Sequence, residues 1–192
     1  MVAINDLADT TAIAHLLKYD SIHGKAAQKI GLESNILRYG DQEIQLFGIS
    51  DPTLLPWEEL DIELVIECTG RFTDRSGAEK HLQAGAKKVI ISAPSLDETI
   101  KMIVLGVNDT VLTGAERIVS NASCTTNCLA PMVHILEENF GIIKGFASTV
   151  HSYTNDQNLH DAPHRDLRRA RAAAYSIIPT TTNAGKALDI VI

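Results

Sequence analysis

The chain has 192 residues, 45% of them apolar and 21% charged, so it can bury a hydrophobic core and is not disordered. Its apolar runs have the length of strands, which excludes a membrane-spanning helix of about 18 residues. Seventeen basic residues stand against 24 acidic ones, and the net charge of −7 disfavours nucleic acid and favours a small-molecule partner.

The cysteine content indicates the compartment. Cys68, Cys124 and Cys128 are few and odd in number, so they predict free thiols in a reducing compartment rather than a disulfide framework. The first residues carry neither a signal peptide nor an Arg/Ser-rich transit pattern. We therefore expect a cytoplasmic protein.

The first two thirds of the chain alternate short apolar runs with helical patterns. Strands are expected at residues 2–4, 64–68, 88–92, 102–105 and 117–119, helices at 12–17 after a cap at Asp9 and at 74–84 before Gly85, and a hairpin around 39–42 with Ile44, Leu46 and Ile49 on its second strand. This alternation predicts an α/β protein with a mostly parallel, doubly wound sheet.

The pattern changes near residue 124. A long helix is expected from there to about Asn139, then a strand over 144–153, then a polar and basic stretch over 155–171. This change predicts a domain boundary after residue 123. The chain opens within a strand pattern and stops within the apolar run 188–192, so we expect it to be part of a longer protein.

Cys124 is the first candidate for chemistry. It follows Ser123, a good N-cap, at the start of the long helix, where free N–H groups and the helix dipole favour a thiolate. His151, at the end of an expected strand, would serve as general base for that thiol. From spacing alone, a small buried cysteine and a core histidine remain open alternatives.

Hydroxyl and arginine clusters suggest anion binding. Ser123, Thr125, Thr154 and the run Thr180–Thr182 could bind phosphate, but capping and β-propensity explain them equally well. The arginines at 168–171 could supply bidentate donors or form a solvated face. Cys124 and Cys128, four residues apart with few other ligands, do not make a metal site. Asp6, at the end of the first strand, could bind a ribose.

One run of twelve residues is long enough to point to a single protein family. Residues 120–131, SNASCTTNCLAP, resemble the active-site signature of phosphorylating glyceraldehyde-3-phosphate dehydrogenases. Further similar segments follow in the order of that family, at residues 3–7, 15–21, 67–72, 151–157 and 177–182. The resemblance implies a Rossmann-type NAD-binding domain at 1–123, incomplete at its N-terminus, and part of an α+β catalytic domain at 124–192, incomplete at its C-terminus.

The resemblance also implies a reaction and its residues. Cys124 would attack the aldehyde of glyceraldehyde 3-phosphate, and His151 would move the proton while hydride leaves for NAD, giving a thioester that inorganic phosphate cleaves to 1,3-bisphosphoglycerate. Phosphate groups would be held by Ser123, Thr125, Thr154, Arg169, Arg171, Thr182 and Asn183. NAD would be held by Asp6, Leu7, Thr69, Gly70, Arg71, Phe72 and Ser92.

The chain departs from the family pattern in places. The family's glycine-rich phosphate turn would precede residue 1, and Asn183 stands where the family usually has Gly, although Asn tolerates positive φ. Ala162–Pro163 keeps the proline of NAD-specific members but not their usual leucine. Asp6 repels a 2′-phosphate, so NAD is expected over NADP.

Other functions remain open. Erythrose-4-phosphate dehydrogenase shares the cysteine motif, and relative turnover of the two sugar phosphates would separate it. A non-catalytic binding role and a redox-sensing thiol protein are the alternatives from other classes. The resemblance implies a homotetramer for the complete protein, and for the chain by itself we expect low stability and little activity.

Overall fold

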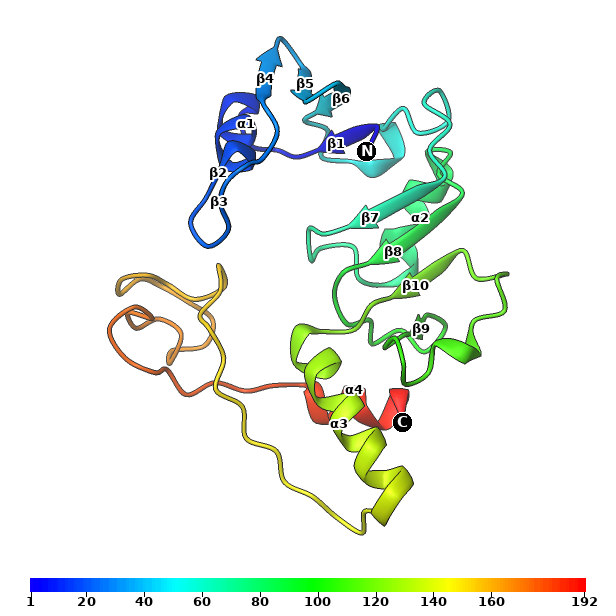
Figure 1. The fold of residues 1–192 in the computed structure, drawn as a ribbon, viewed down its shortest axis with the longest axis vertical. Coiled ribbons are helices and arrows are strands. Elements are labelled where there is room, and N and C mark those ends of the chain that lie inside the picture. The colour runs from blue at the N-terminus through cyan, green and yellow to red at the C-terminus, as the bar shows by residue number, and fades with distance from the viewer. The chain divides into compact units, whose positions relative to one another are not determined.

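A computed structural model describes residues 1–192, and the chain divides into two compact units (Figure 1). Unit 1 comprises Met1–Lys101 and Gly114–Ser120, and unit 2 comprises Met102–Thr113 and Asn121–Ile192. None of the helices is both long enough and apolar enough to cross a bilayer. Each unit is described by itself below.

The first sheet of unit 1 has the order β1-β6-β5-β4. Its strands are β1 (Ala3–Asn5), β4 (Ile30–Glu33), β5 (Ile36–Tyr39) and β6 (Gln42–Phe47). β1 and β6 are parallel, and β4, β5 and β6 form an antiparallel meander. The β5–β6 turn places Gly40 at φ +60°, a conformation that glycine adopts without strain. Leu37, Ile44 and Leu46 form the buried core of this sheet.

Helix α1 (Thr10–Lys18) follows β1 directly. Asp9 caps it by accepting the N–H groups of Thr11 and Ala12, which satisfies two of the free donors of its first turn. A short ribbon of β2 (Tyr19–Asp20) and β3 (Gly24–Lys25) comes next. The expected strand, helix and hairpin of the first 50 residues are therefore confirmed.

The second sheet has the order β7-β8-β10-β9. Its strands are β7 (Leu64–Glu67), β8 (Lys88–Ile91), β9 (Lys101–Met102) and β10 (Ile118–Ser120), with β7, β8 and β10 parallel. Helix α2 (Arg75–Gln83) packs on the face that carries Val65, Val89 and Ile118. Leu64 and Ile66 point to the opposite face and are exposed. The 3₁₀ turns η1 (Pro52–Leu54) and η2 (Asp109–Val111) lie in the connections.

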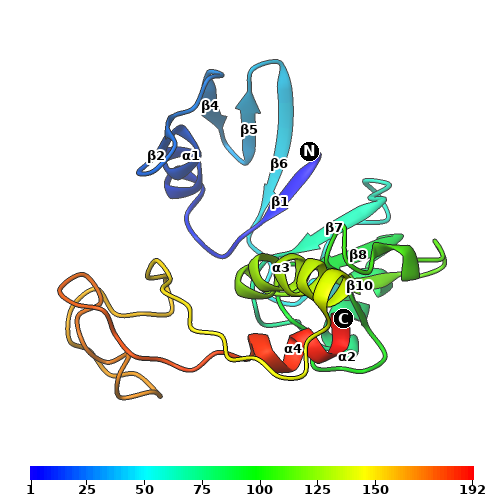
Figure 2. The same cartoon turned by 60° about the horizontal axis from the view of Figure 1, so that its bottom comes forward.

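Unit 2 is built on two helices, α3 (Cys124–Phe140) and α4 (Ala184–Val191), which lie side by side in Figure 2. Ala130, Ala187 and Val191 form the buried contact between them together with Met102, Val104 and Ala122. Residues 141–183 contain no helix or strand.

The expected α/β class with parallel strand pairing is confirmed, with the strands shared between two sheets. Three local expectations were wrong. Ile49 lies beyond the end of β6 and packs against the α2 core instead. Only Lys101–Met102 pairs as a strand, because the N–H of Val104 is bonded to the Asn108 side chain rather than to a neighbouring strand.

The third error concerns residues 144–153, which form no strand. A strand exists only when another segment pairs with its backbone groups, and no backbone hydrogen bond joins this stretch to another segment. Phe146 is 96% exposed and Val150 is 85% exposed. The apolar residues that suggested a strand therefore have no face to cover. The last apolar run, 188–192, forms the end of α4.

Candidate active site

Cys124 is the first residue of α3, directly after the loop that leaves β10. Ser123 caps the helix: its Oγ accepts the N–H of Thr126 at 3.0 Å and lies 2.7 Å from the buried Thr126 hydroxyl. Cys124 is exposed, so its sulfur is open to a reagent. The helix N-terminus places the positive end of the dipole beside that sulfur.

The loop before Cys124 is tightly held. Ala122 has φ +56°, in the left-handed region that costs a non-glycine residue about 1–2 kcal/mol. The Asn127 side-chain amide donates to the carbonyls of Asn121 at 2.8 Å and of Ser123 at 3.0 Å. These two bonds join the loop to the first turn of the helix, and so they fix the position of Cys124.

His151 faces the thiol. Its Nε2 lies 3.2 Å from Cys124 Sγ, and its Nδ1 lies 2.7 Å from the carbonyl of Ser152. A carbonyl only accepts, so Nδ1 carries a proton and Nε2 is the nitrogen that exchanges a proton with sulfur. A neutral thiol–imidazole pair converts to a thiolate–imidazolium pair by moving that single proton.

The ionisation of both groups favours the charged pair. The hydrogen bond from His151 lowers the pKa of the Cys124 thiol, and the Thr125 hydroxyl acts in the same direction. The Ser152 carbonyl and then the sulfur raise the pKa of His151. The sulfur is thus a stronger nucleophile near neutral pH than an isolated thiol.

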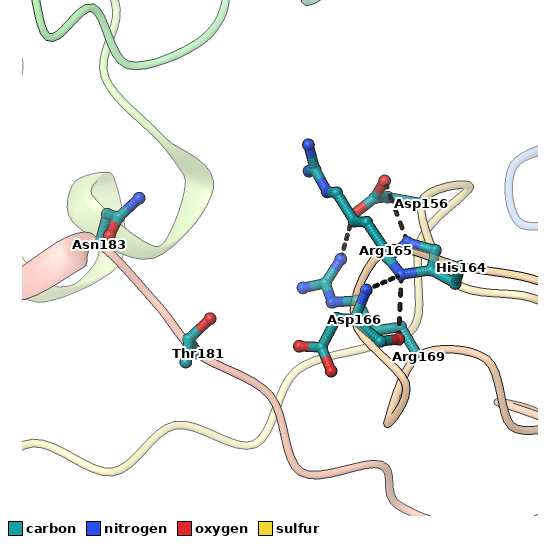
Figure 3. Close-up of a pocket in the computed structure, with 7 residues that line it drawn as sticks. All are labelled: Asp156, His164, Arg165, Asp166, Arg169, Thr181 and Asn183. Atoms are coloured by element: carbon teal, nitrogen blue, oxygen red, sulfur yellow. Dashed lines mark hydrogen bonds and ion pairs between the residues drawn. The ribbon is translucent and has the colours of Figure 1, made fainter.

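A polar pocket lies in the 156–183 region of unit 2 (Figure 3). Its lining residues come from one loop and from the segment before α4: Asp156, His164, Arg165, Asp166, Arg169, Thr181 and Asn183. Arg169 pairs with Asp156 and donates from Nε to Thr180 Oγ1 at 2.8 Å. Arg168 lowers the pKa of Asp166 to about 2. Arg165 is the lining arginine that has no ion-pair partner, and the sequence analysis missed it.

The structure places the other predicted phosphate residues as follows. Ser123 and Thr125 adjoin Cys124, and the Thr182 hydroxyl accepts the N–H of Ala184 at 3.2 Å. Arg171 pairs with Asp161 at 3.2 Å, outside the pocket. Asn183 precedes α4 with φ −94°, so the positive φ that its type tolerates is not used there. Thr154 is exposed, and its N–H donates to Gln157.

The predicted cofactor residues lie in unit 1 at the carboxyl ends of parallel strands. Asp6 and Leu7 follow β1, and Asp6 Oδ1 accepts the N–H of Ala8 at 2.8 Å while Oδ2 has no partner. Thr69–Phe72 follow β7, and Ser92 follows the adjacent β8. The carboxyl edge of a parallel sheet is where α/β proteins bind their ligands.

Sequence reasoning also missed a buried polar group. His81 hydrogen-bonds to Trp57 and to Glu67, and Glu67 accepts the N–H of Thr69, where the next turn begins. The available signal was an acidic residue that closes the apolar run 64–66. No group of three or more His, Cys, Asp or Glu side chains is arranged to hold a metal ion.

By this arrangement the chain belongs to the α/β proteins that carry an activated thiol, a cysteine of lowered pKa at a helix N-terminus beside a histidine. Residues 1–75 match the family model described as glyceraldehyde 3-phosphate dehydrogenase, NAD binding domain, and residues 123–192 match the C-terminal domain of the same family. The chain belongs to the glyceraldehyde-3-phosphate dehydrogenase family.

Individual relatives agree. The chain is 55% identical over 191 residues to the glyceraldehyde-3-phosphate dehydrogenase of Mycoplasma pneumoniae, 55% over 193 residues to that of Geobacillus stearothermophilus, and 56% over 191 residues to that of Thermotoga maritima. Each match covers 100% of this chain and 57% of the relative. The chain therefore spans less than two thirds of the length of these curated relatives.

Proposed function

We propose that the protein oxidises glyceraldehyde 3-phosphate with NAD and inorganic phosphate to 1,3-bisphosphoglycerate, as a glycolytic enzyme. The observation that carries this proposal is the 3.2 Å contact between Cys124 Sγ and His151 Nε2 at the start of α3. A thiolate with an imidazolium beside it can add to an aldehyde and then manage the proton that the addition creates.

The chain's own groups act in sequence. The Cys124 thiolate forms a carbon–sulfur bond with the aldehyde carbon, and His151 Nε2 gives its proton to the aldehyde oxygen. His151 takes that proton back as the thiohemiacetal is oxidised to the thioester. A phosphate oxygen then attacks the thioester carbon, and the sulfur leaves as the thiolate. NAD, when bound, supplies the acceptor for the hydride.

The residues of unit 1 fit NAD. The free Oδ2 of Asp6 is available to a ribose hydroxyl, and its charge disfavours the 2′-phosphate of NADP. Leu7, Thr69, Gly70, Arg71, Phe72 and Ser92 are proposed to line the same site. This assignment agrees with the family model for residues 1–75, which is described as an NAD binding domain.

Phosphate groups are proposed to bind in unit 2. Ser123 and Thr125 flank the nucleophile, and Thr154, Arg169, Arg171, Thr182 and Asn183 are the further candidates. Arg169 has to exchange its bond with Asp156 for the phosphate, and the unpaired Arg165 in the same pocket adds positive charge without such an exchange.

The wider organisation is also proposed. We assign residues 1–123 to an NAD-binding domain and 124–192 to a catalytic domain, within a homotetramer in the cytoplasm. The compartment is proposed from the small and odd number of cysteines, which favours a reducing environment.

The test measures NADH formation by the purified protein with glyceraldehyde 3-phosphate, NAD and phosphate. A hybrid in which these residues replace the 193 aligned residues of the Geobacillus stearothermophilus relative supplies the remaining length. Cys124→Ser should abolish turnover, while Cys128→Ser, one helical turn away and also exposed, should retain it.

The outcomes separate the alternatives. Faster turnover of erythrose 4-phosphate would assign the related dehydrogenase. No turnover of either sugar phosphate by the hybrid would refute the dehydrogenase proposal and leave a binding or thiol-sensing role.

A further inference from the structure

A chain of buried polar side chains lies beneath the turn that follows β7. Trp57 Nε1 donates to His81 Nδ1 at 3.1 Å, and His81 Nε2 lies 2.9 Å from Glu67 Oε2. Glu67 Oε1 accepts the backbone N–H of Thr69 at 2.6 Å and also the Thr69 hydroxyl. Thr69 Oγ1 accepts the N–H of Arg71 at 3.1 Å. The core is thereby connected to the turn by continuous hydrogen bonds.

The chemistry of the donors determines which atoms carry protons in this hydrogen-bonded series. An indole N–H only donates, so His81 Nδ1 must hold a lone pair and Nε2 must carry the ring proton. His81 is then neutral and donates to Glu67. The ionised carboxylate of Glu67 is an acceptor only, which matches the three donors that meet it, one from His81 and two from Thr69.

Burial makes this arrangement costly. Glu67 is 3% exposed, and His81 and Trp57 are each 5% exposed. Burial by itself would raise the pKa of Glu67, but the hydrogen bonds from His81 and Thr69 outweigh burial and lower the pKa. A buried carboxylate that is satisfied by hydrogen bonds adds little net stability compared with apolar packing. Its effect is therefore to be sought in the orientation of the turn.

A second restraint acts on the same turn from α2. A Cβ on Gly77 would lie 2.9 Å from Phe72 Cα, so only glycine allows the helix to approach this closely. The ring of Phe72 also meets the ring of His81 edge-to-face, with centroids 6.2 Å apart. The residues at both ends of the turn, Thr69 and Phe72, are thus tied to α2.

We propose that Glu67 and His81 are positioning residues for NAD, which hold the turn of Thr69–Phe72 in its binding conformation through Thr69. The inference rests on the proposed function, because it takes this turn as part of the NAD site. Two observations support that choice: the turn follows the carboxyl end of a parallel strand, and it lies within the residues matched by the NAD binding domain. Glu67 and His81 act through Thr69 and need not touch the cofactor.

Glu67→Gln is the direct test. The carboxamide keeps the shape of the side chain, but its NH₂ group must face either His81 Nε2–H or the Thr69 donors, so two donors oppose each other in either orientation. We expect NAD to bind roughly tenfold more weakly, as measured by calorimetry on the purified protein. The alkylation rate of Cys124, which lies in unit 2, should not change.

Two variants make the test specific. Trp57→Phe removes the indole donor, so His81 can move its proton to Nδ1 and accept from the new carboxamide. The double variant should therefore recover much of the NAD affinity that Glu67→Gln loses. Glu79→Gln, a change at a half-buried position on the same α2 whose side chain pairs with Arg75, is the matched control and should bind NAD like the wild type.

Two further readouts keep the test decisive. Trp57 is the only tryptophan, so its fluorescence reports the hydrogen bond between Trp57 and His81. The fluorescence should change in Glu67→Gln but not in Glu79→Gln. If Glu67→Gln does not fold, Thr69→Val removes one of the two Thr69 donors to Glu67 but leaves the buried side chains unchanged, and it should weaken NAD binding by about threefold.

The outcomes distinguish this inference from the proposed function. Weaker binding by Glu67→Gln with recovery in the double variant supports the inference. Equal NAD affinity in the wild type and in Glu67→Gln, or in Thr69→Val if Glu67→Gln is unfolded, would overturn it and leave the proposed function standing. A wild-type protein that binds no NAD, either by itself or within the hybrid, would overturn both.

Discussion

The charge of His151 should set the reactivity of Cys124, and His151→Gln tests this because the amide keeps an N–H donor but carries no charge. The two groups lie 3.2 Å apart, and both are exposed, so the dielectric constant of water applies to their interaction. Coulomb's law then gives about 1.3 kcal/mol for the ion pair, or about ninefold in the thiolate fraction at low pH.

The intrinsic reactivity of sulfur works against this gain. A thiolate of lower pKa is a weaker nucleophile, and a Brønsted slope of about 0.45 reduces the ninefold advantage to about threefold. Iodoacetamide alkylation of Cys124 should therefore be about threefold slower in His151→Gln near pH 6. Above pH 9 both thiols are ionised and the imidazole is neutral, so the two rates should become similar. The two pH profiles should converge.

The assay is site-resolved mass spectrometry of alkylation from pH 5 to pH 10, with Cys128 in the same molecule as the internal control. Cys128 is exposed on the same helix, and its profile should not respond to the substitution. Profiles of Cys124 that coincide or run parallel in the two proteins would refute the assignment of His151 as its ion-pair partner.

Three further predictions concern stability. Ala122→Gly should change the free energy of unfolding by less than about 1 kcal/mol, because relief of the φ +56° strain offsets the lost methyl burial, whereas Ala122→Val should be clearly destabilising in urea unfolding. Gly85→Ala should lower the free energy of unfolding by more than about 2 kcal/mol, since φ is +106° and a Cβ would lie 2.4 Å from Glu58 Cβ. Gly185→Ala, in open space on α4, should raise it by about 0.5–1 kcal/mol. Equal unfolding midpoints for these two variants would contradict the packing argument. Glu67 has a lowered pKa, so its stabilisation is present above its ordinary pKa of 4.5 and is lost as the pH falls through the lower, folded-state value; acid unfolding of Glu67→Gln should lack this part of the pH dependence, and parallel stability curves would count against it.

The parts of the fold that were predictable have causes within a few residues. Asp9 and Ser123 cap helices because their side chains reach the next N–H groups, and Gly85 ends α2 because it adopts positive φ. The hairpin turn at Gly40 is equally local. The prediction of a strand over residues 144–153 was wrong because a strand needs a partner from another part of the chain. An alternating apolar pattern does not supply that partner.

The residues of the site also differ in whether local sequence could predict them. The helix N-terminus made Cys124 a candidate on local grounds, and the chemistry of thiols suggested His151 27 positions away, which the structure places beside it. The Glu67–His81–Trp57 chain was not accessible to such reasoning. Its members come from a strand, a helix and a loop, and their complementarity exists only after α2 packs on the sheet.

The two halves of the thiol–imidazole pair are anchored very differently. Cys124 is fixed by a helix cap and by the Asn127 amide, whereas His151 follows the stretch 143–150, whose backbone makes no hydrogen bond to another segment. The pair therefore behaves as a tethered two-component system, in which the effective concentration of imidazole at the sulfur depends on how narrowly the tether is confined. Any strand that pairs with residues 144–150 would raise that effective concentration, and with it the reactivity of Cys124, without contacting either side chain.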